Sequence, residues 1–188
     1  MTSTSHPPST PTPTPPPPPT PTASPACVPA PSTDWQDYQS LVQLHGAYAS
    51  VVDAGDWKRW PDFFIEDAVY RIVPRENHER GFPLATLAFD NRRAMLDRVF
   101  GIEETIFHDP YYQRHVVGPP LVHRCDATAI ECESNYAVFR TKLDGPSTVF
   151  NVGRYLDTVV RTPHGMKFAS RICVYDSEMI PNAIIYPI

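Results

Sequence analysis

Apolar residues recur at helical spacing in three segments of the first half of the chain. The first segment begins after Asp34, a residue type that caps helix N-termini, and ends at Gly55. A short second segment follows Asp56, and a third follows Asp90. This spacing predicts three helices. Their apolar positions are Trp35, Tyr38, Leu41, Val42, Tyr48, Val51 and Val52, then Trp57, Trp60 and Phe64, then Met95, Leu96, Val99 and Ile102.

The other segments are rich in β-branched and aromatic residues, which is typical of strands. Two short strands are expected near 69–73 and 84–89, and four long ones at about 112–122, 128–143, 148–161 and 166–180. Long consecutive strands joined by tight turns favour an antiparallel meander with the helices on one face. The sequence therefore predicts an α+β fold, a curved antiparallel sheet wrapped by about three N-terminal helices.

Turn residues suggest how the last three strands pair. A three-residue loop, Pro163-His164-Gly165, can place Thr162 opposite Met166. A four-residue loop at 145–148 can join the preceding pair of strands. Both registers keep large apolar residues on one face, which a slip of one residue would destroy. That expected apolar face contains Ala137, Phe139, Leu143, Phe150, Val152, Leu156, Val160, Phe168, Ile172 and Val174.

Two charged residues, Arg154 and Asp176, interrupt this face. In the expected register they are diagonal neighbours, and long side chains can span a diagonal between strands. Because an isolated buried charge costs several kcal/mol, we predict that they form a structural ion pair.

Proline is concentrated at the N-terminus, where residues 1–32 hold thirteen of the 23 prolines and no charged residue. The run PTPTPPPPPTPT (11–22) favours polyproline II, since proline fixes φ and lacks a backbone donor. We expect a disordered Pro/Thr-rich tail at 1–33 and one domain at 34–188. The tail is either an extension without a specific role, or a ligand for a proline-binding groove or a tether to a partner.

Composition excludes several classes of function. A net charge of −5 argues against nucleic-acid binding, and the absence of a long apolar run argues against a membrane span. The N-terminus lacks the features of a secretory signal, and the four cysteines form no metal-binding motif. We therefore expect a cytoplasmic protein with reduced thiols.

Candidate chemistry is sparse. His108, Asp109 and His115 are of types that bind iron or zinc, but residues seven apart on a strand point to opposite sides. His123 shares a side with His115 but lies about 26 Å away on an extended strand. No nucleophile, nucleotide-binding or iron–sulfur motif is present. The residues thus predict no catalytic, cofactor-binding or metal-binding site in this chain.

Three stretches resemble the small (beta) subunit of bacterial aromatic-ring-hydroxylating (Rieske) oxygenases, and most strongly that of salicylate 5-hydroxylase. They are YRIVPRENHERGFPL (70–84), HDPYYQRHVVG (108–118) and RYLDTVVRTPHGMKFASRICVYDSEMIPNAIIYPI (154–188). The resemblance implies a cone-like fold similar to nuclear transport factor 2 and scytalone dehydratase. It also implies a structural subunit in a hexamer of three large and three small subunits.

The resemblance places the chemistry in the partner. The large (alpha) subunit of such enzymes carries the Rieske [2Fe-2S] cluster and a mononuclear Fe(II), and NAD(P)H supplies electrons through separate proteins. The expected reaction adds oxygen from O2 to an aromatic acid such as salicylate or a benzoate-like compound. Two alternatives stay open. One is a stand-alone dehydratase or isomerase with an acid/base pocket, which His115 or Asp176 facing a void would favour. The other is a binding module acting through the proline tail.

If the chain is such a subunit, its exposed loops should make subunit contacts. Aromatic residues and Arg are favoured at interface centres. The candidate interface residues are Arg75, Glu76, Asn77 and Arg80 in one loop, Tyr111, Tyr112 and Arg114 in another, and Tyr186 near the C-terminus.

Deletion of residues 1–32 should leave folding and hydroxylase activity intact, because the resemblance begins just after that segment. Co-purification with a large subunit and turnover of the assembled enzyme measure this. A lost complex or lost activity in the truncated chain would show that the tail is required.

Overall fold

A computed structural model describes residues 33–177 and 183–188. Residues 1–32 of the predicted tail at 1–33 lie outside the described residues, as does the end of the last predicted strand at 178–180. The division into a tail and a domain therefore stays a prediction. Within the described ranges, no helix has both the length and the apolar content to cross a membrane. Three cysteines in these ranges, Cys125, Cys132 and Cys173, form no disulfide.

The first predicted helix is confirmed as α1 (Trp35–Asp53), which ends before Gly55 with its φ of 69°. The second is a 3-10 helix, η1 (Trp57–Phe63), and the third is α3 (Arg92–Phe100), followed by a π-helical turn, η2 (Gly101–Thr105). Asn91, rather than Asp90, caps α3, since its side chain accepts a hydrogen bond from the Ala94 N–H. A short helix, α2 (Arg75–Glu79), lies where only a loop was expected.

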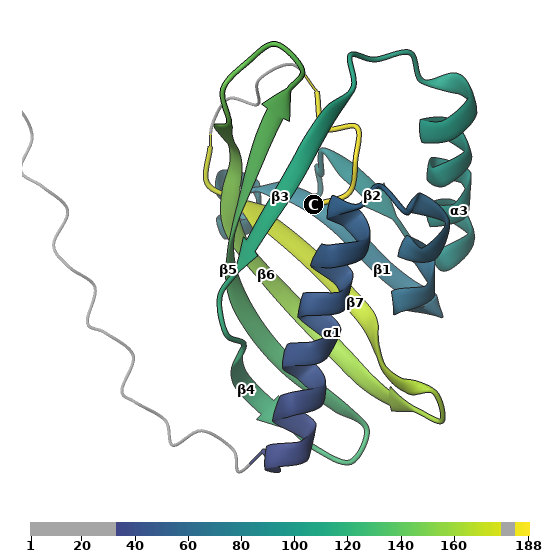
Figure 1. Cartoon of the computed structure of the whole chain (residues 1–188). Helices are drawn as coiled ribbons and strands as arrows, with labels where there is room; N and C mark the ends of the chain where they lie inside the picture. The colour runs from purple at the N-terminus through teal and green to yellow at the C-terminus, as the bar shows by residue number, and fades with distance from the viewer. Residues whose placement is uncertain (1–32, 178–182) are drawn as a thin grey trace, which may run out of the picture.

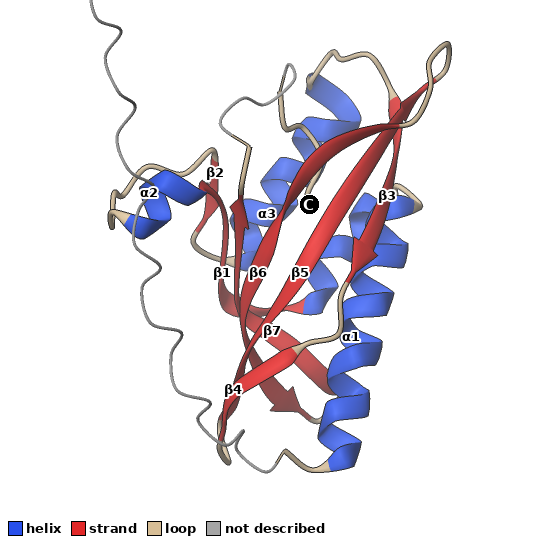
Figure 2. Ribbon diagram, turned by 90° about the vertical axis from the view of Figure 1, so that its left-hand side faces the viewer, coloured by secondary structure: helices blue, strands red, loops and turns tan. Residues whose placement is uncertain are grey.

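Seven strands form one sheet in the order β2-β1-β7-β6-β5-β3, with β4 also paired to β5. Figures 1 and 2 show α1 lying along one face of this curved sheet, so the predicted α+β class is confirmed. The sheet is mixed, because β1 runs parallel to β7, and the purely antiparallel arrangement was wrong in this respect. The strands are β1 (Phe64–Pro74), β2 (Leu87–Phe89), β3 (Tyr111–Val117), β4 (Leu121–Cys125), β5 (Ala129–Lys142), β6 (Thr148–Thr162) and β7 (Gly165–Tyr175).

The predicted β6–β7 register is confirmed over its inner part, where Arg154 pairs with Val174. Nearer the turn a bulge shifts the pairing, so that Thr162 lies opposite Gly165 and the turn has two residues instead of three. The β5–β6 register was wrong. Ala137 pairs with Val152, because residues 141–147 form a longer connection than the expected four-residue loop.

The face that packs against α1 is mostly not the expected apolar face. On β5 and β6 the buried positions include Tyr136, Val138, Tyr155 and Asp157, whereas Leu156 is only half-buried. Both faces of these strands carry apolar residues, so an apolar count could not decide which face the helix covers. The buried face is aromatic and partly polar, and this determines what the interior of the cone can hold.

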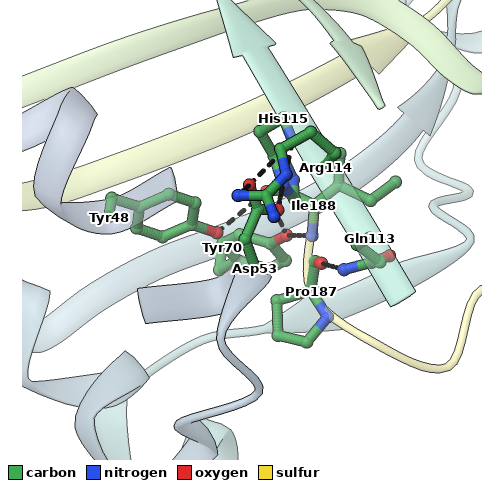
Figure 3. A network of polar contacts seen from close by, with 8 residues as sticks. All are labelled: Tyr48, Asp53, Tyr70, Gln113, Arg114, His115, Pro187 and Ile188. Atoms are coloured by element: carbon green, nitrogen blue, oxygen red, sulfur yellow. Dashed lines mark hydrogen bonds and ion pairs between the residues drawn. The ribbon is translucent and has the colours of Figure 1, made fainter. Parts of the chain in front are cut away.

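The C-terminal residues pack into the core. Ile188 is fully buried, and its main-chain oxygen accepts hydrogen bonds from the Tyr48 hydroxyl (2.8 Å) and the Tyr70 hydroxyl (3.0 Å). Trp60 donates in turn from its indole nitrogen to the Tyr48 oxygen (3.2 Å). Figure 3 shows both tyrosines pointing at Ile188. This network joins α1, η1, β1 and the C-terminal segment.

Substitution of Gly153 on β6 tests the close contact between β6 and β7. A Cβ at this position would lie 2.1 Å from the main-chain oxygen of Val174, so Gly153→Ala must displace backbone. We expect a loss of about 3 kcal/mol or more in the free energy of unfolding, measured by urea denaturation. The control is Gly46→Ala in α1, where a Cβ meets no atom within 4 Å. It should stabilise by about 0.5–1 kcal/mol. Equal stability of the two variants would contradict the close β6–β7 approach.

Candidate functional site

A buried ion pair occupies the interior of the cone, between α1 and the sheet. Arg171 on β7 is 0% exposed, and its Nε and Nη2 donate to the two carboxylate oxygens of Asp157 on β6 at 2.9 and 2.8 Å. The two residues are direct cross-strand partners. Burial opposes the charge on Arg171, but the adjacent carboxylate outweighs it and raises the pKa of Arg171 above its ordinary value.

Three aromatic rings complete the surroundings of this guanidinium. Its central carbon lies 3.9 Å from the ring centre of Phe168 and 4.2 Å from those of Tyr48 and Tyr155. Its Nη1 has no hydrogen-bond partner in the described structure, so the electron-rich ring faces supply the remaining contact. The space in which a cone-shaped fold could hold a substrate is therefore filled by side chains at this level.

His45 of α1 extends the cluster. Its Nε2 lies 3.3 Å from Asp157 Oδ2, and its Nδ1 lies 3.3 Å from the Ser134 hydroxyl. Burial and the charge of Arg171 lower the pKa of His45 to about 4, although Asp157 acts in the opposite direction. The imidazole is therefore neutral at pH 7, and the cluster carries one balanced pair of charges.

The same region contains a set of metal-ligand types, since donor atoms of His45, Cys132 and Asp157 all lie within 4.8 Å of one another. The chemistry does not suit a metal. Both Asp157 oxygens already bind Arg171, whose positive charge would repel a cation. Burial also raises the pKa of the Cys132 thiol to about 12, which disfavours the thiolate that a metal needs. The arrangement fits a structural ion pair.

A second polar cluster lies at the C-terminal end of α1, where Asp53 accepts hydrogen bonds from His115 on β3. The His115 Nδ1 lies 2.6 Å from Asp53 Oδ1, and the His115 N–H lies 3.0 Å from Oδ2. Arg114 Nη1 lies 3.6 Å from the same carboxylate, as Figure 3 shows. Both His115 and Asp53 are nearly buried, so this contact joins α1 to β3. His115 is thus held against α1 through Nδ1, whereas its buried Nε2 has no hydrogen-bond partner among the described residues.

The expected Arg154–Asp176 pair was wrong. Arg154 Nη1 lies 3.7 Å from Glu133 on β5, which is its diagonal neighbour on that side. Asp176 lies 3.2 Å from Arg75, because the parallel β1–β7 pairing brings the residues that follow these two strands together. The prediction considered only the pairing of β6 with β7. Arg154 has a closer partner on β5, and Asp176 has one in α2.

The candidate interface residues lie in three different settings. In and after α2, Arg75, Glu76 and Arg80 are exposed, and Arg80 pairs with Glu76 at 3.2 Å. The Asn77 side chain donates to the Leu84 main-chain oxygen.

On β3, Tyr112 is 70% exposed and Arg114 is exposed, whereas Tyr111 is half-buried beneath Arg140. Tyr186 requires a correction, because it is only 8% exposed. It stacks on Trp57 and hydrogen-bonds to His108, so it belongs to the packing of its own chain.

Comparisons with known proteins give the family. The sequence profile of the SnoaL-like domain matches residues 33–172. The small subunit of anthranilate 1,2-dioxygenase from Burkholderia cepacia is 33% identical over 156 residues, which cover 82% of this chain and 96% of that protein. The chain belongs to the SnoaL-like family and is a homologue of aromatic-ring dioxygenase small subunits.

Two further relatives agree with this family. The beta 1 subunit of the terminal oxygenase component of terephthalate 1,2-dioxygenase from a Comamonas species is 28% identical over 148 residues, covering 79% of this chain and 96% of that protein. A solved structure from Novosphingobium aromaticivorans, assigned as the beta subunit of an aromatic-ring-hydroxylating dioxygenase, superposes with a TM-score of 0.73 at 26% identity. The superposition covers 79% of this chain and 94% of that one. The predicted resemblance is confirmed at the level of the dioxygenase small subunits.

The buried pair in this SnoaL-like chain was missed from the sequence, although a signal existed. The expected β6–β7 register already places Asp157 directly opposite Arg171. The prediction paired Arg154 with Asp176 because it assigned the apolar face to the wrong side of the sheet. A pair of opposite charges directly across two strands was the stronger indication.

The low pKa of His45 predicts a specific pH dependence of stability. The unfolded chain binds a proton near pH 6.5, whereas the folded chain does so only near pH 4. The contribution of neutral His45 to the free energy of unfolding is therefore fully present above pH 6.5. It falls by about 3 kcal/mol as the pH drops to 4. Urea denaturation across this range measures the slope. His45→Gln should flatten it, and the control His164→Gln, at an exposed turn, should not. If the pH dependence of the free energy of unfolding is the same in His45→Gln as in the wild type, the lowered pKa of His45 is not its cause.

Proposed function

We propose that this chain is the non-catalytic small subunit of a multicomponent oxygenase that hydroxylates an aromatic acid. The observation that carries this is the 33% identity to the anthranilate dioxygenase small subunit over 96% of that protein. In this proposal three copies assemble with three large subunits. Those partners hold the Rieske cluster and the mononuclear iron, and separate proteins deliver electrons from NAD(P)H. The contribution of this chain is to orient the large subunits.

An aromatic carboxylic acid is the substrate class that the relatives support. The names of two of them refer to anthranilate and terephthalate, which are both benzene carboxylates. The sequence resemblance to the small subunit of salicylate 5-hydroxylase points to the same class of substrate. We propose salicylate or a benzoate-like acid, bound by the large subunit.

The interior of the cone supports a structural role over a stand-alone dehydratase or isomerase. Such an enzyme needs titratable groups that converge on an open cavity. Here Asp157 is held by Arg171, and His115 by Asp53. Asp176 lies at the surface beside Arg75. Asp157, His115 and Asp176 therefore each have a charged or hydrogen-bonding partner, which supports a structural role for them.

We propose that the end of the sheet formed by β3 and the β5–β6 connection contacts the large subunit. Tyr112 and Leu143 are 70% and 78% exposed, and both line a shallow cleft of about 130 Å³ with Pro110 and Tyr111. Large exposed apolar side chains gathered in one place mark protein interfaces more often than open surface. The charged α2 segment, with Arg75, is a candidate contact to a neighbouring small subunit.

Co-expression with a large subunit of the same dioxygenase family tests the proposal. We expect a stable complex on size exclusion that shows the visible absorption of a Rieske cluster. Failure of every such large subunit to co-purify would contradict it, as would turnover of an aromatic or polyketide substrate by the purified chain alone.

Within that complex, Tyr112→Asp combined with Leu143→Asp should reduce co-purification at least tenfold, because the substitution buries charges at the contact. The control is Leu96→Asp on α3, an exposed leucine that does not line this cleft. Circular dichroism of each isolated variant shows whether it remains folded. Equal co-purification of both variants would place the large-subunit contact elsewhere.

A further inference from the structure

A groove lined by aromatic rings and amide groups runs along the N-terminal half of α1. It has a volume of about 600 Å³ and is lined by Trp35, Tyr38, Gln39, Val42, Gln43 and Pro119. Trp35 is 68% exposed, although it is one of the largest apolar side chains in the molecule. Its ring stacks on that of Tyr38 with centroids 6.0 Å apart and planes 21° apart. Tyr38 packs partly against the core, but neither the core nor the proposed subunit contacts account for the exposure of Trp35.

The chemistry of the groove suits a polyproline II segment. Proline-rich ligands dock in aromatic-lined grooves, where their rings pack between aromatic side chains. The backbone of polyproline II has no internal hydrogen bonds, so its carbonyl oxygens are free to accept from a surface. The indole N–H of Trp35 and the side-chain amides of Gln39 and Gln43 are donors of the required kind. A neutral groove also suits a ligand without charge.

The chain itself contains such a ligand. Residues 11–22 read PTPTPPPPPTPT and include five consecutive prolines at 15–19. From Trp35 to Gln43 the helix rises by about 12 Å, since each residue contributes about 1.5 Å. Polyproline II rises about 3.1 Å per residue, so four or five prolines match this length. No charged residue occurs before Asp34, and therefore no charge must be desolvated on docking.

The connection is long enough for docking within one molecule. Residues 20–34 separate the five prolines from the start of the groove. The root-mean-square span of a random-coil chain of fifteen residues is about 20 Å. It can therefore turn back along the helix, and the effective concentration of the segment at the groove is on the order of millimolar. Modest intrinsic affinity is then sufficient.

We propose that residues 11–22 dock as a polyproline II segment in the Trp35–Tyr38 groove of the same chain. The docked segment covers an aromatic surface that would otherwise be open to non-specific association. This is a binding function of α1 that is separate from the assembly role. It does not depend on the identity of the large subunit. It is also compatible with a deletion of the tail that leaves folding and activity intact.

Fluorine NMR of the full chain labelled with 5-fluorotryptophan tests the proposal. The chain has three tryptophans, and Trp35→Phe identifies the Trp35 signal. Replacement of prolines 15–19 by Ser should shift that signal and raise its sensitivity to a soluble paramagnetic probe at least twofold. The signals of Trp57 and Trp60 should not change. The matched control replaces the same number of prolines outside the segment, at Pro7, Pro8, Pro25, Pro29 and Pro31.

A synthetic peptide, PTPTPPPPPTPT, provides the second measurement. Added to the chain with serines at 15–19, it should restore the wild-type Trp35 signal in a saturable manner. A further Val42→Asp substitution in that chain should abolish the restoration, while circular dichroism confirms the fold.

Three results would overturn the proposal. One is a Trp35 signal that is the same with and without prolines 15–19, or that the control substitutions change equally. Another is a difference that grows with protein concentration, which would show docking between copies. The last is protection of Trp35 only when a large subunit is bound, which would make the groove a subunit contact.

Discussion

The ion pair between Asp157 and Arg171 is the constraint around which the rest of the molecule is arranged. A guanidinium with no exposed surface is stable only if a carboxylate binds it with good geometry and the remaining surface is well packed. β6 supplies the carboxylate, and α1, β6 and β7 supply the rings of Tyr48, Tyr155 and Phe168. The position of α1 on the sheet is thus coupled to the correct pairing of β6 with β7.

This interior supports the proposed role of the chain as a structural subunit. A cone made of a curved sheet and a covering helix offers an enclosed volume. In this chain that volume is filled by a charge pair, a neutral histidine and aromatic rings. The C-terminal segment also fills part of the interior, since the Ile188 main-chain oxygen accepts hydrogen bonds from both Tyr48 and Tyr70. The outer surface, with α2 and the β3 end of the sheet, is what the protein can present to partners.

Local patterns in the sequence predicted the elements well and their long-range contacts poorly. Helix α1 followed from its spacing and from Asp34 and Gly55, which are local signals. The inner β6–β7 register followed from one turn, since hairpin pairing is nearly local. The parallel pairing of β1 with β7 joins segments about a hundred residues apart, and no turn connects them. Its absence from the prediction is the reason why Asp176 was assigned to Arg154 instead of Arg75. The residues that fill the interior were misassigned for a related reason, because apolar residues occupy both faces of β5 and β6.

The parallel pairing of β1 with β7 also affects how the chain folds during its synthesis on the ribosome. β1 has its central neighbour only after β7 has been made, and Tyr48 and Tyr70 find their acceptor only at Ile188. Until then α1, η1 and β1 expose aromatic residues that later lie in the core. Contacts of such large sequence separation slow folding, because the loop entropy is lost before the contacts form. The core around α1, η1 and β1 therefore becomes complete only after β7 and Ile188 have been synthesised.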